Sequence, residues 1–481
     1  MNKTNIKKNI LPILCVLAMF ACIVFLCPKA MQNDTFWSIK VGEKIVDEWT
    51  WKVDDLSMHD GLKYVAHHFY TDVIIYFVYI ISGFDGLYVL EIVMACGLAF
   101  ALYFLNKELS GSKKLAYCMT GLQTLLMAPY ISVRAQMISY ILFVIEILLL
   151  EKLRKQEKLK YYLWLIAIPL LLTNFHMGVA PFYFIILGVY GLECIKLKFL
   201  WIEPNTNPNT SKLKKLVLCG VIGVVLLFVN PYGLDGVLYP FKTIGNEFIN
   251  STIMEFQPFS MNNSMTVLQV AYIMLVMFIF MVSKAKVNLK DMLLIFGTLF
   301  MNFMAFRYTG LFIICSAVIA IYILDVIKRL KIDNIDRISF VVTSILMLTV
   351  VCMNIYSDDE YLTDIVAPVK AVEILKENMD ENTILYNEYN WGAYLMLNDI
   401  KPFIDSRCDL YTSEYNEGIT VAEDFNKISR LEDGYKEAME KYNFNTYLVM
   451  TDGLTRIVLD ADETLEIIYT DETATLYQKK K

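Results

Sequence analysis

The segment "NILPILCVLAMFACIVFLCPKAMQNDTFW", residues 9–37, joins a long apolar run to a polar turn that carries an acid. The run from Ile10 to Cys27 is long enough to cross a bilayer and follows a lysine-rich N-terminus. The CPK sequence at its end is a poor cleavage site for a signal peptide, so we expect a retained first membrane helix. Asp34 then lies where the chain first returns to water.

The composition of the whole chain is typical of a polytopic membrane protein. Its 481 residues are 56% hydrophobic and only 19% charged, whereas a soluble domain averages about a quarter charged residues. The net charge of -7, without a basic stripe, argues against a nucleic-acid partner. The cysteines, apart from Cys408, lie in or beside apolar segments, so we interpret them as small hydrophobic residues rather than a disulfide framework.

The placement of lysine and arginine predicts the topology. One ambiguous segment, 69–84, contains an acid and fits an amphipathic helix that lies on the membrane surface. With that segment flat, the basic loops share one side, and the short loops opposite hold only Arg134, Lys242 and Arg307. Eleven membrane-spanning helices remain, near 9–27, 86–105, 115–132, 136–150, 161–175, 177–195, 214–231, 265–283, 291–306, 308–325 and 338–356.

This topology predicts a cytoplasmic N-terminus and two domains in a plasma membrane protein. A transmembrane domain, 1–356, carries a first outer loop at 28–85 and a second at 232–264. An extracytoplasmic tail domain, 357–481, alternates helical and strand-like segments, which favours a small α/β sheet. We expect helices at 369–379 and 431–442, and strands at 383–386, 402–404, 447–450, 466–469 and 474–477.

The first outer loop carries the strongest catalytic candidates. Asp34 is either the N-cap of a helix or a general base at the membrane surface. His67, His68 and Asp72 follow in "YVAHHFYTD", where Asp72 and His68 share one helical face. They are either a solvated polar face or part of a site. The spacing is no metal signature, so we expect no metal, although a divalent cation between Asp34 and a histidine is left open.

Two isolated arginines on the outer connections are candidates for binding an anion. Arg134 and Arg307 either reach lipid headgroups or clamp a phosphate, for which a guanidinium is well shaped. His176 in "TNFHMG" and Glu255 in "MEFQPF" are weaker candidates on the same side. Glu91 and Glu146 lie near the ends of spans, where reaching the headgroups suffices to explain them.

The tail concentrates polar residues at two expected strand ends, in "NEYNWGAYLMLNDIKPFIDSRCDLY". Trp391, Asp405 and Arg407 are candidates there, because ligands commonly lie at strand ends in α/β sheets. For Asp405 and Arg407 a structural ion pair is the alternative, and we favour it.

Together these motifs resemble the GT-C class of membrane glycosyltransferases, in the branch related to protein O-mannosyltransferases and aminoarabinose transferases. The chain is similar to a bacterial family that shares a D-x-x-W-x-I-x-x-G-E stretch, which here runs from Asp34 to Glu43. The likeness continues through "YVAHHFYTD", "VRAQMISY", "NFHMG", "NPYG", "RYTGLF" and "WGAYL…FIDSRCDLY". Asn33 and Thr35 flank Asp34 in place of the second acid that several such families carry.

The resemblance implies a polytopic α-helical GT-C-like fold that transfers sugar from a polyprenyl-phosphate donor to a glycan, lipid or protein acceptor. It places the catalytic acid in the first outer loop, at Asp34, beside acceptor-orienting residues His67, His68, Asp72, His176 and Glu255. Arg134 and Arg307 would hold the lipid phosphate. The alternatives are a transporter for lipid-linked saccharide, or a membrane scaffold that keeps the fold without activity.

Overall fold

The fold is described by a computed structural model for residues 3–49, 51–196, 208–243, 246–258, 264–331, 341, 343–349 and 360–480. Two compact units divide the chain. The helical unit contains Met1–Pro28, Tyr88–Val237 and Ile253–Asp358. The mixed unit contains Lys29–Leu87, Leu238–Thr252 and Asp359–Lys481. The predicted domain boundary at 356/357 lies outside the described residues.

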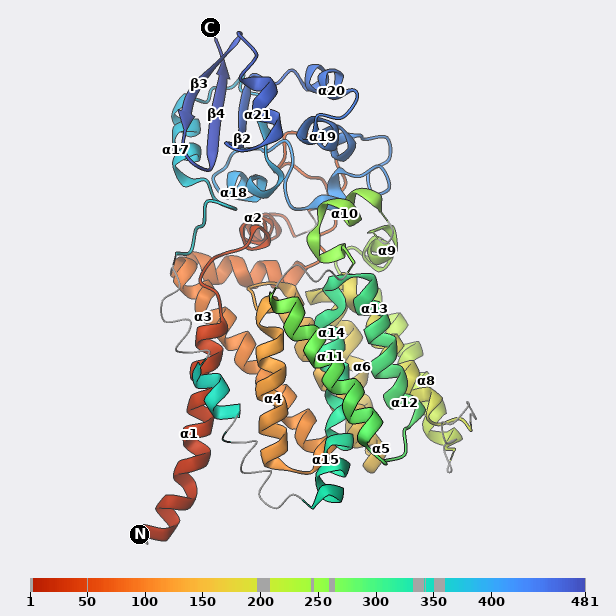
Figure 1. The fold of residues 1–481 in the computed structure, drawn as a ribbon. Helices are drawn as coiled ribbons and strands as arrows, with labels where there is room; N and C mark the ends of the chain where they lie inside the picture. Colours follow the sequence, from red (N-terminus) through yellow and green to blue (C-terminus); the bar gives the residue numbers. More distant parts are fainter. Residues whose placement is uncertain are drawn as a thin grey trace. The chain divides into compact units, whose positions relative to one another are not determined.

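Long helices build the helical unit, and most run along a common direction (Figure 1). They are α1 (Lys3–Leu26), the later part of α3 (Phe69–Ser110), α4 (Lys113–Met127), α5 (Ala135–Lys155), α6 (Leu159–Phe175), α7 (Ala180–Leu192), α8 (Thr210–Leu227), α11 (Ser264–Val282), α12 (Leu289–Met292), α13 (Thr298–Met304), α14 (Thr309–Cys315) and α15 (Ile319–Leu330). A π-helical turn, Leu293–Gly297, joins α12 to α13, and a 3-10 turn, Ser316–Val318, joins α14 to α15.

Ten of the eleven predicted spans fall on these helices, and most of the eleventh, 338–356, lies outside the described residues. The side chains of the bundle are apolar inside and outside. Leu102, Val144 and Ile314 are fully buried, while Val221 and Met281 are well exposed. An apolar outer surface on a helical bundle is what a lipid environment requires. The number of spans and their orientation stay predictions.

Two acids within the bundle contradict the sequence interpretation. Glu146 has no exposed surface, and Glu91 is 2% exposed. Both carboxylates therefore lie among the helices of the unit and do not reach the headgroup level, so the interpretation that they extend to the headgroups is wrong. The cause is helix packing, because both residues face neighbouring helices and not the outer surface of the bundle.

Helix α3 consists of two helices that meet at Gly83, where the backbone has φ 58° and ψ -149°. Only glycine adopts that conformation without strain, so the break is encoded in the sequence. The helix predicted at 69–84 is therefore present up to this break, and its first residues belong to the mixed unit. Its position on a membrane surface stays a prediction.

A four-stranded sheet with the order β1-β2-β4-β3 organises the mixed unit. β1 (Leu385–Asn387) pairs in parallel with β2 (Thr446–Met450), while β4 (Ala474–Lys479) is antiparallel to β2 and to β3 (Leu465–Thr470). Around it lie α2 (Asn33–Asp47), α9 (Leu234–Thr243, shared with the helical unit), α10 (Glu247–Thr252), α17 (Val369–Asn378), α18 (Gly392–Leu397), α19 (Val421–Arg430), α20 (Tyr435–Tyr442) and α21 (Leu454–Leu459).

Two predicted elements of the tail differ from the structure. Residues 402–404 form no strand, because their backbone bonds to other groups: the Phe403 amide donates to the Asn387 side chain (2.8 Å), and the Phe403 carbonyl meets His59 Nε2 (2.7 Å). The helix predicted at 431–442 begins only at Tyr435. Leu431 and Gly434 have positive φ values of 52° and 89°, which end one helix and start another.

The first outer loop and the tail fold together within the mixed unit. The Met31 amide donates to the Tyr361 carbonyl (2.9 Å), and the Met58 amide to the Pro402 carbonyl (3.0 Å). α2 packs along α18, with the rings of Phe36 and Tyr394 5.5 Å apart. These contacts join segments more than 300 positions apart in the sequence, so the loop acquires its shape from the tail.

Candidate functional site

Asp34 lies in the first turn of α2 but is not its N-cap. The N-cap is Gln32, whose carbonyl accepts the Thr35 amide at 2.9 Å. An acid in the first turn is favoured by the helix dipole. Oδ1 of Asp34 accepts a hydrogen bond from Trp37 Nε1 at 3.2 Å, and the residue is half-buried. The N-cap interpretation is therefore wrong, and the carboxylate is held by an indole.

Trp37 begins a ladder of rings beside this carboxylate. Its indole stacks on His68, with centroids 5.5 Å apart and planes at 19°, and His68 lies edge-on to His67 at 4.1 Å. His67 stacks in turn on Tyr239, at 4.4 Å and 13°. Trp37 is 3% exposed, so it is part of this ladder and not a membrane anchor, whereas Trp49 is exposed. The structure thus brings both predicted histidines to the helix that carries Asp34.

Asp72, which the sequence places beside Asp34 as an orienting residue, is the second acid of this region, and its complete burial was not predicted. It has no exposed surface, and neither carboxylate oxygen has a partner in hydrogen-bond geometry among the described residues, although the Ser38 side chain faces it. Burial raises the pKa of Asp72 well above its ordinary range, and the charge of nearby Asp34 raises it further. A solvated polar face is therefore wrong for Asp72, while His67 and His68 are half-exposed.

The glycine of the D-x-x-W-x-I-x-x-G-E motif explains this proximity. A Cβ atom on Gly42 would lie 2.2 Å from the Asp72 carbonyl oxygen and 2.7 Å from Tyr76 Cβ. Only glycine therefore allows α2 to approach the start of α3 so closely. The sequence has no second acid adjacent to Asp34, whereas the fold brings Asp72 near it across a helix contact.

The tail also reaches the start of α2. Asn33 Nδ2 donates to Asn390 Oδ1 at 3.2 Å, directly after the carboxyl end of β1. Gly392 lets this segment pack tightly, since a Cβ there would lie 2.0 Å from the Ile404 carbonyl oxygen. Trp391 is fully buried and donates from Nε1 to the Asp364 carbonyl at 3.2 Å. Trp391 thus packs in the fold, and Asn390 of the tail contacts Asn33, the residue that precedes the candidate base.

Asp405 and Arg407 form a buried ion cluster with a partner that the sequence did not reveal. Arg407 is 1% exposed and binds Asp405 through Nε at 2.9 Å and Nη2 at 2.7 Å, while its Nη1 binds Asp54 at 2.5 Å. Tyr411 also donates to Asp405. Burial opposes charge on Asp54, but Arg407 and Ser57 hold its pKa below the ordinary value. These buried ion pairs therefore have a structural role, because they join the first outer loop to the tail.

In the helical unit, the two isolated arginines meet around one glutamate. Arg134, the N-cap residue of α5, binds Glu255 at 2.7 Å, and the Arg307 guanidinium lies 4.1 Å from the centroid of the Phe256 ring. The Phe306 amide donates to the Gln257 carbonyl (3.0 Å), which fixes the two turns together. The charge of Arg134, with a smaller effect of Arg307, lowers the pKa of Glu255.

His176 is positioned by α5 as well. Its Nδ1 lies 2.7 Å from Ser139 Oγ, and the imidazole is 7% exposed. Ser139 follows Arg134 by five residues on α5, so His176 lies within two helical turns of the arginine cluster. In the described part of the chain, no group of three or more histidine, cysteine, aspartate or glutamate side chains is arranged to bind a metal ion.

The fold resembles those of solved membrane glycosyltransferases. The Archaeoglobus fulgidus oligosaccharyltransferase, solved with a tethered acceptor peptide, matches 91% of this chain and 68% of its own at 13% identity, with a TM-score of 0.55. ArnT from Cupriavidus metallidurans bound to undecaprenyl phosphate matches 97% of both chains at 11% identity, with a TM-score of 0.58. The mycobacterial arabinofuranosyltransferase AftD matches 96% of this chain and 41% of its own at 9% identity, with a TM-score of 0.57.

The chain therefore has the fold of the GT-C membrane glycosyltransferases, which confirms the predicted resemblance at the level of the superfamily fold. The branch within that class stays a prediction. No protein-family model and no curated protein sequence matches the chain.

Proposed function

We propose that this protein is a multi-pass plasma membrane glycosyltransferase that moves a sugar from a polyprenyl-phosphate donor to an acceptor on the outer face. The observation that carries the proposal is the arginine cluster of the helical unit, where Arg134 binds Glu255 and the charge of Arg307 also lowers the pKa of that carboxyl. Two guanidinium groups beside one acid leave a positive charge that suits a phosphate. The N-terminus would be cytoplasmic and the tail extracytoplasmic.

In this mechanism the bond between the anomeric carbon and the phosphate oxygen breaks as an acceptor oxygen attacks that carbon. Asp34 takes the proton of the acceptor, and the configuration of the sugar inverts. Arg134 and Arg307 stabilise the negative charge that grows on the departing polyprenyl phosphate.

The surroundings of Asp34 suit this role. The Trp37 indole donates a hydrogen bond to Oδ1 of Asp34, and burial raises the pKa of the nearby Asp72 carboxyl. Asp34 is only half-buried, so of the two acids it is the one that an acceptor hydroxyl can reach. His67 and His68 provide ring faces and polar edges next to it, which would orient a hydroxyl-bearing acceptor. His176 would assist near the arginine cluster, and the tail would bind the acceptor or cover the site.

The structural neighbours support the general substrates. One neighbour was solved with undecaprenyl phosphate and another with an acceptor peptide. By analogy the donor here is lipid-linked, and the acceptor is a glycan, a lipid or a protein. No cofactor is required by the proposed step.

A single-turnover reaction tests the proposal. Purified full-length protein is incubated with undecaprenyl phosphate-linked hexoses and pentoses and an extract of cell-envelope glycans, and release of undecaprenyl phosphate is measured. We expect Asp34→Asn to reduce release by about 100-fold or more, because a general base contributes roughly 10²–10⁴-fold. Asp47→Asn, at the exposed end of the same helix, should retain wild-type activity.

Equal activity of wild type and Asp34→Asn would overturn Asp34 as the base. Absence of any release by the wild type across the donor panel would overturn the transfer reaction and leave a transporter or an inactive scaffold.

A buried acid favours one alternative function. Glu146 lies inside the helical unit without a hydrogen-bond partner in the described residues, and intramembrane acids of this kind commonly serve transport. A transporter of lipid-linked saccharide would move the donor across the bilayer and leave its sugar–phosphate bond intact. The same incubation separates the two functions, because only the transferase releases undecaprenyl phosphate.

A further inference from the structure

A hollow of about 310 Å³ lies in the helical unit between the last turn of α3 and the last turn of α5. It has no part in the proposed transfer. Its lining consists of Phe104, Lys107, Glu108, Gly111, Lys152 and Lys155. Apart from Phe104, at the end of the predicted span 86–105, these residues belong to the basic connections that are predicted to be cytoplasmic, whereas the arginine cluster lies on the opposite predicted side.

The charges around the hollow are unequal. Lys155 binds the single acid of the lining, Glu108, at 2.8 Å. Lys107 and Lys152 form no ion pair within the described ranges, and Lys107 Nζ lies 5.9 Å from the centroid of the Phe104 ring. Three lysines and one glutamate therefore give the hollow a positive charge, and two ammonium groups remain for a ligand.

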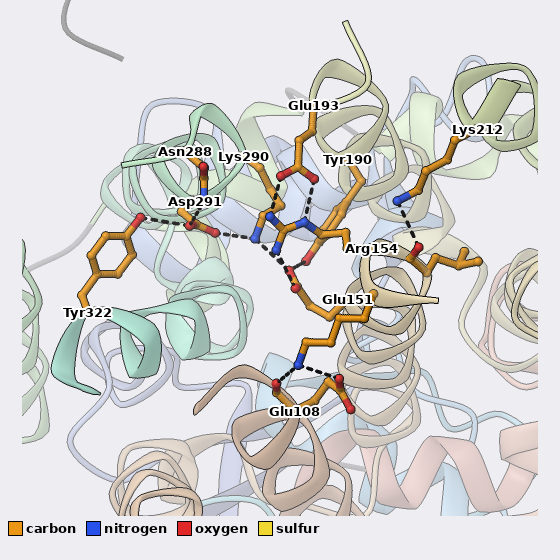
Figure 2. Close-up of polar contacts among 12 residues, drawn as sticks. Glu108, Glu151, Arg154, Tyr190, Glu193, Lys212, Asn288, Lys290, Asp291 and Tyr322 are labelled. Atoms are coloured by element: carbon orange, nitrogen blue, oxygen red, sulfur yellow. Dashed lines mark hydrogen bonds and ion pairs between the residues drawn. The ribbon is translucent and has the colours of Figure 1, made fainter. Parts of the chain in front are cut away.

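An ionic network fixes the α5 wall of the hollow. Arg154 binds Glu151 at 2.8 Å and both oxygens of Glu193 at 2.7 and 2.8 Å, while Lys290 binds Glu151 at 2.7 Å (Figure 2). Figure 2 also shows Glu108 apart from this group. Because the network holds the end of α5, Lys152 and Lys155, three residues apart, present their side chains together.

Buried amides fix the α3 wall. Asn106 donates to Gln123 at 2.7 Å, and Gln123 donates to the Ile313 carbonyl at 2.9 Å, which ties the end of α3 to α4 and α14. Ser110 donates to the Asn106 carbonyl, and Gly111 turns the chain with a φ of 67°. The hollow is therefore formed before any ligand arrives, so little ordering is required on binding.

We propose that this hollow binds a phosphate ester. Lys107 and Lys152 contact the phosphate oxygens, and the half-exposed Phe104 ring contacts the carbon skeleton of the ester. The volume is at the lower end of the range for small-molecule sites, which suits a headgroup rather than a large ligand. Basic pockets between membrane helices on the cytoplasmic side commonly hold anionic headgroups, and a soluble phosphate ester has the same chemistry.

Equilibrium binding to the purified full-length protein tests the site with three probes. They are dihexanoyl phosphatidylglycerol, sn-glycerol 3-phosphate and dihexanoylglycerol, which lacks the phosphate. We expect Lys107→Gln together with Lys152→Gln to weaken binding of the phosphate probes tenfold or more. Neither lysine forms an ion pair among the described residues, so the double variant should keep the fold. Lys113→Gln with Lys114→Gln is the matched control, because these lysines are exposed and do not line the hollow.

The result also identifies the source of the phosphate. Binding of phosphatidylglycerol at least tenfold tighter than glycerol phosphate indicates a lipid headgroup, and equal affinity indicates a soluble ester; both support the site. The proposal is overturned if both double variants weaken binding equally, if dihexanoylglycerol binds as well as the phosphate lipid, or if no phosphate probe binds. Loss of the proposed transfer activity has no bearing on these outcomes.

Discussion

Arginine is used in opposite ways in the two units. In the mixed unit, Arg407 is almost fully buried and meets two carboxylates, Asp54 and Asp405. In the helical unit, Arg134 and Arg307 are partly exposed; Arg134 binds Glu255, and the charge of Arg307 acts on the same carboxyl group. The first cluster has more acid than base, and the second has more base than acid.

This difference separates a structural ion pair from a binding site. Each of the three guanidinium nitrogens of buried Arg407 binds a protein carboxylate, and these bonds join two segments of the chain. A pair of arginines that shares one acid keeps positive charge directed at solvent or ligand. The number of neighbouring acids, which the sequence does not show, therefore decides which arginines take part in the proposed chemistry.

The largest expected effect concerns Arg407. Arg407→Met leaves Asp54 and Asp405 buried without a counter-charge, which costs about 3–5 kcal/mol. We expect a large loss of folded protein and a lower unfolding temperature, measured by size-exclusion chromatography and thermal unfolding in detergent. Arg430→Met, at an arginine that is 48% exposed and 3.8 Å from Glu432, should change the unfolding free energy by less than about 0.5 kcal/mol.

Equal stability of the two methionine variants would show that the buried ion cluster does not stabilise the fold. Asp54→Asn keeps the contact of Arg407 with Asp405, so it should destabilise the protein less than Arg407→Met does. It is the variant to measure if Arg407→Met yields no folded protein.

The next effect concerns Arg307 and activity. Arg307→Ala should lower release of undecaprenyl phosphate about 100-fold, since one oxyanion-stabilising donor contributes roughly 10²–10³-fold, while the unfolding temperature stays near that of the wild type. Arg307→Lys keeps the charge but not the paired donors and should be intermediate. Arg329→Ala, an exposed arginine at the end of α15, is the control. If Arg307→Ala keeps wild-type activity, the excess of positive charge at the arginine cluster no longer supports phosphate binding there.

The smallest effect is a pH dependence at Glu255. Because Arg134 lowers the pKa of Glu255 in the folded state, its contribution to stability is fully present above the ordinary pKa of about 4.3 and is lost as pH falls through the lower, folded value. The pair is partly exposed, so we expect at most about 1 kcal/mol. The unfolding temperatures of wild type and Glu255→Gln should differ at pH 7 and converge toward pH 3.

Glu466→Gln, on the exposed face of β3, should show no such convergence. A difference between wild type and Glu255→Gln that is constant with pH would mean that the carboxylate charge does not carry the interaction.

Much of the helical architecture could be predicted from the sequence, because hydrophobic length is a local signal. The same holds for the break near Gly83 and for the helix that carries Asp34. The tail strands were found where apolar alternation is clear, but residues 402–404 were misassigned, since their backbone bonds to Asn387 and His59 depend on distant segments.

The candidate sites were predicted less completely, for the same reason. Asp34, the histidines and the arginines were found as residue types at helix ends. The burial of Asp72 and Glu146 depends on helix packing, and the Asp54–Arg407 bond joins positions 353 residues apart. No pattern in a single sequence reports such distances. A short Asp-x-x-Ser turn at Asp54 is the one local signal that marks its carboxylate as an acceptor.

The Asp54–Arg407 bond also has a consequence for biosynthesis. At about 5–20 residues per second, a ribosome makes Arg407 on the order of 20–70 s after Asp54. For that period the first outer loop is already on the far side of the membrane by the predicted topology, with a carboxylate that lacks its counter-charge. A chain that ends before position 407 keeps that defect permanently. The bond thus distinguishes chains that reach Arg407 from chains that end before it.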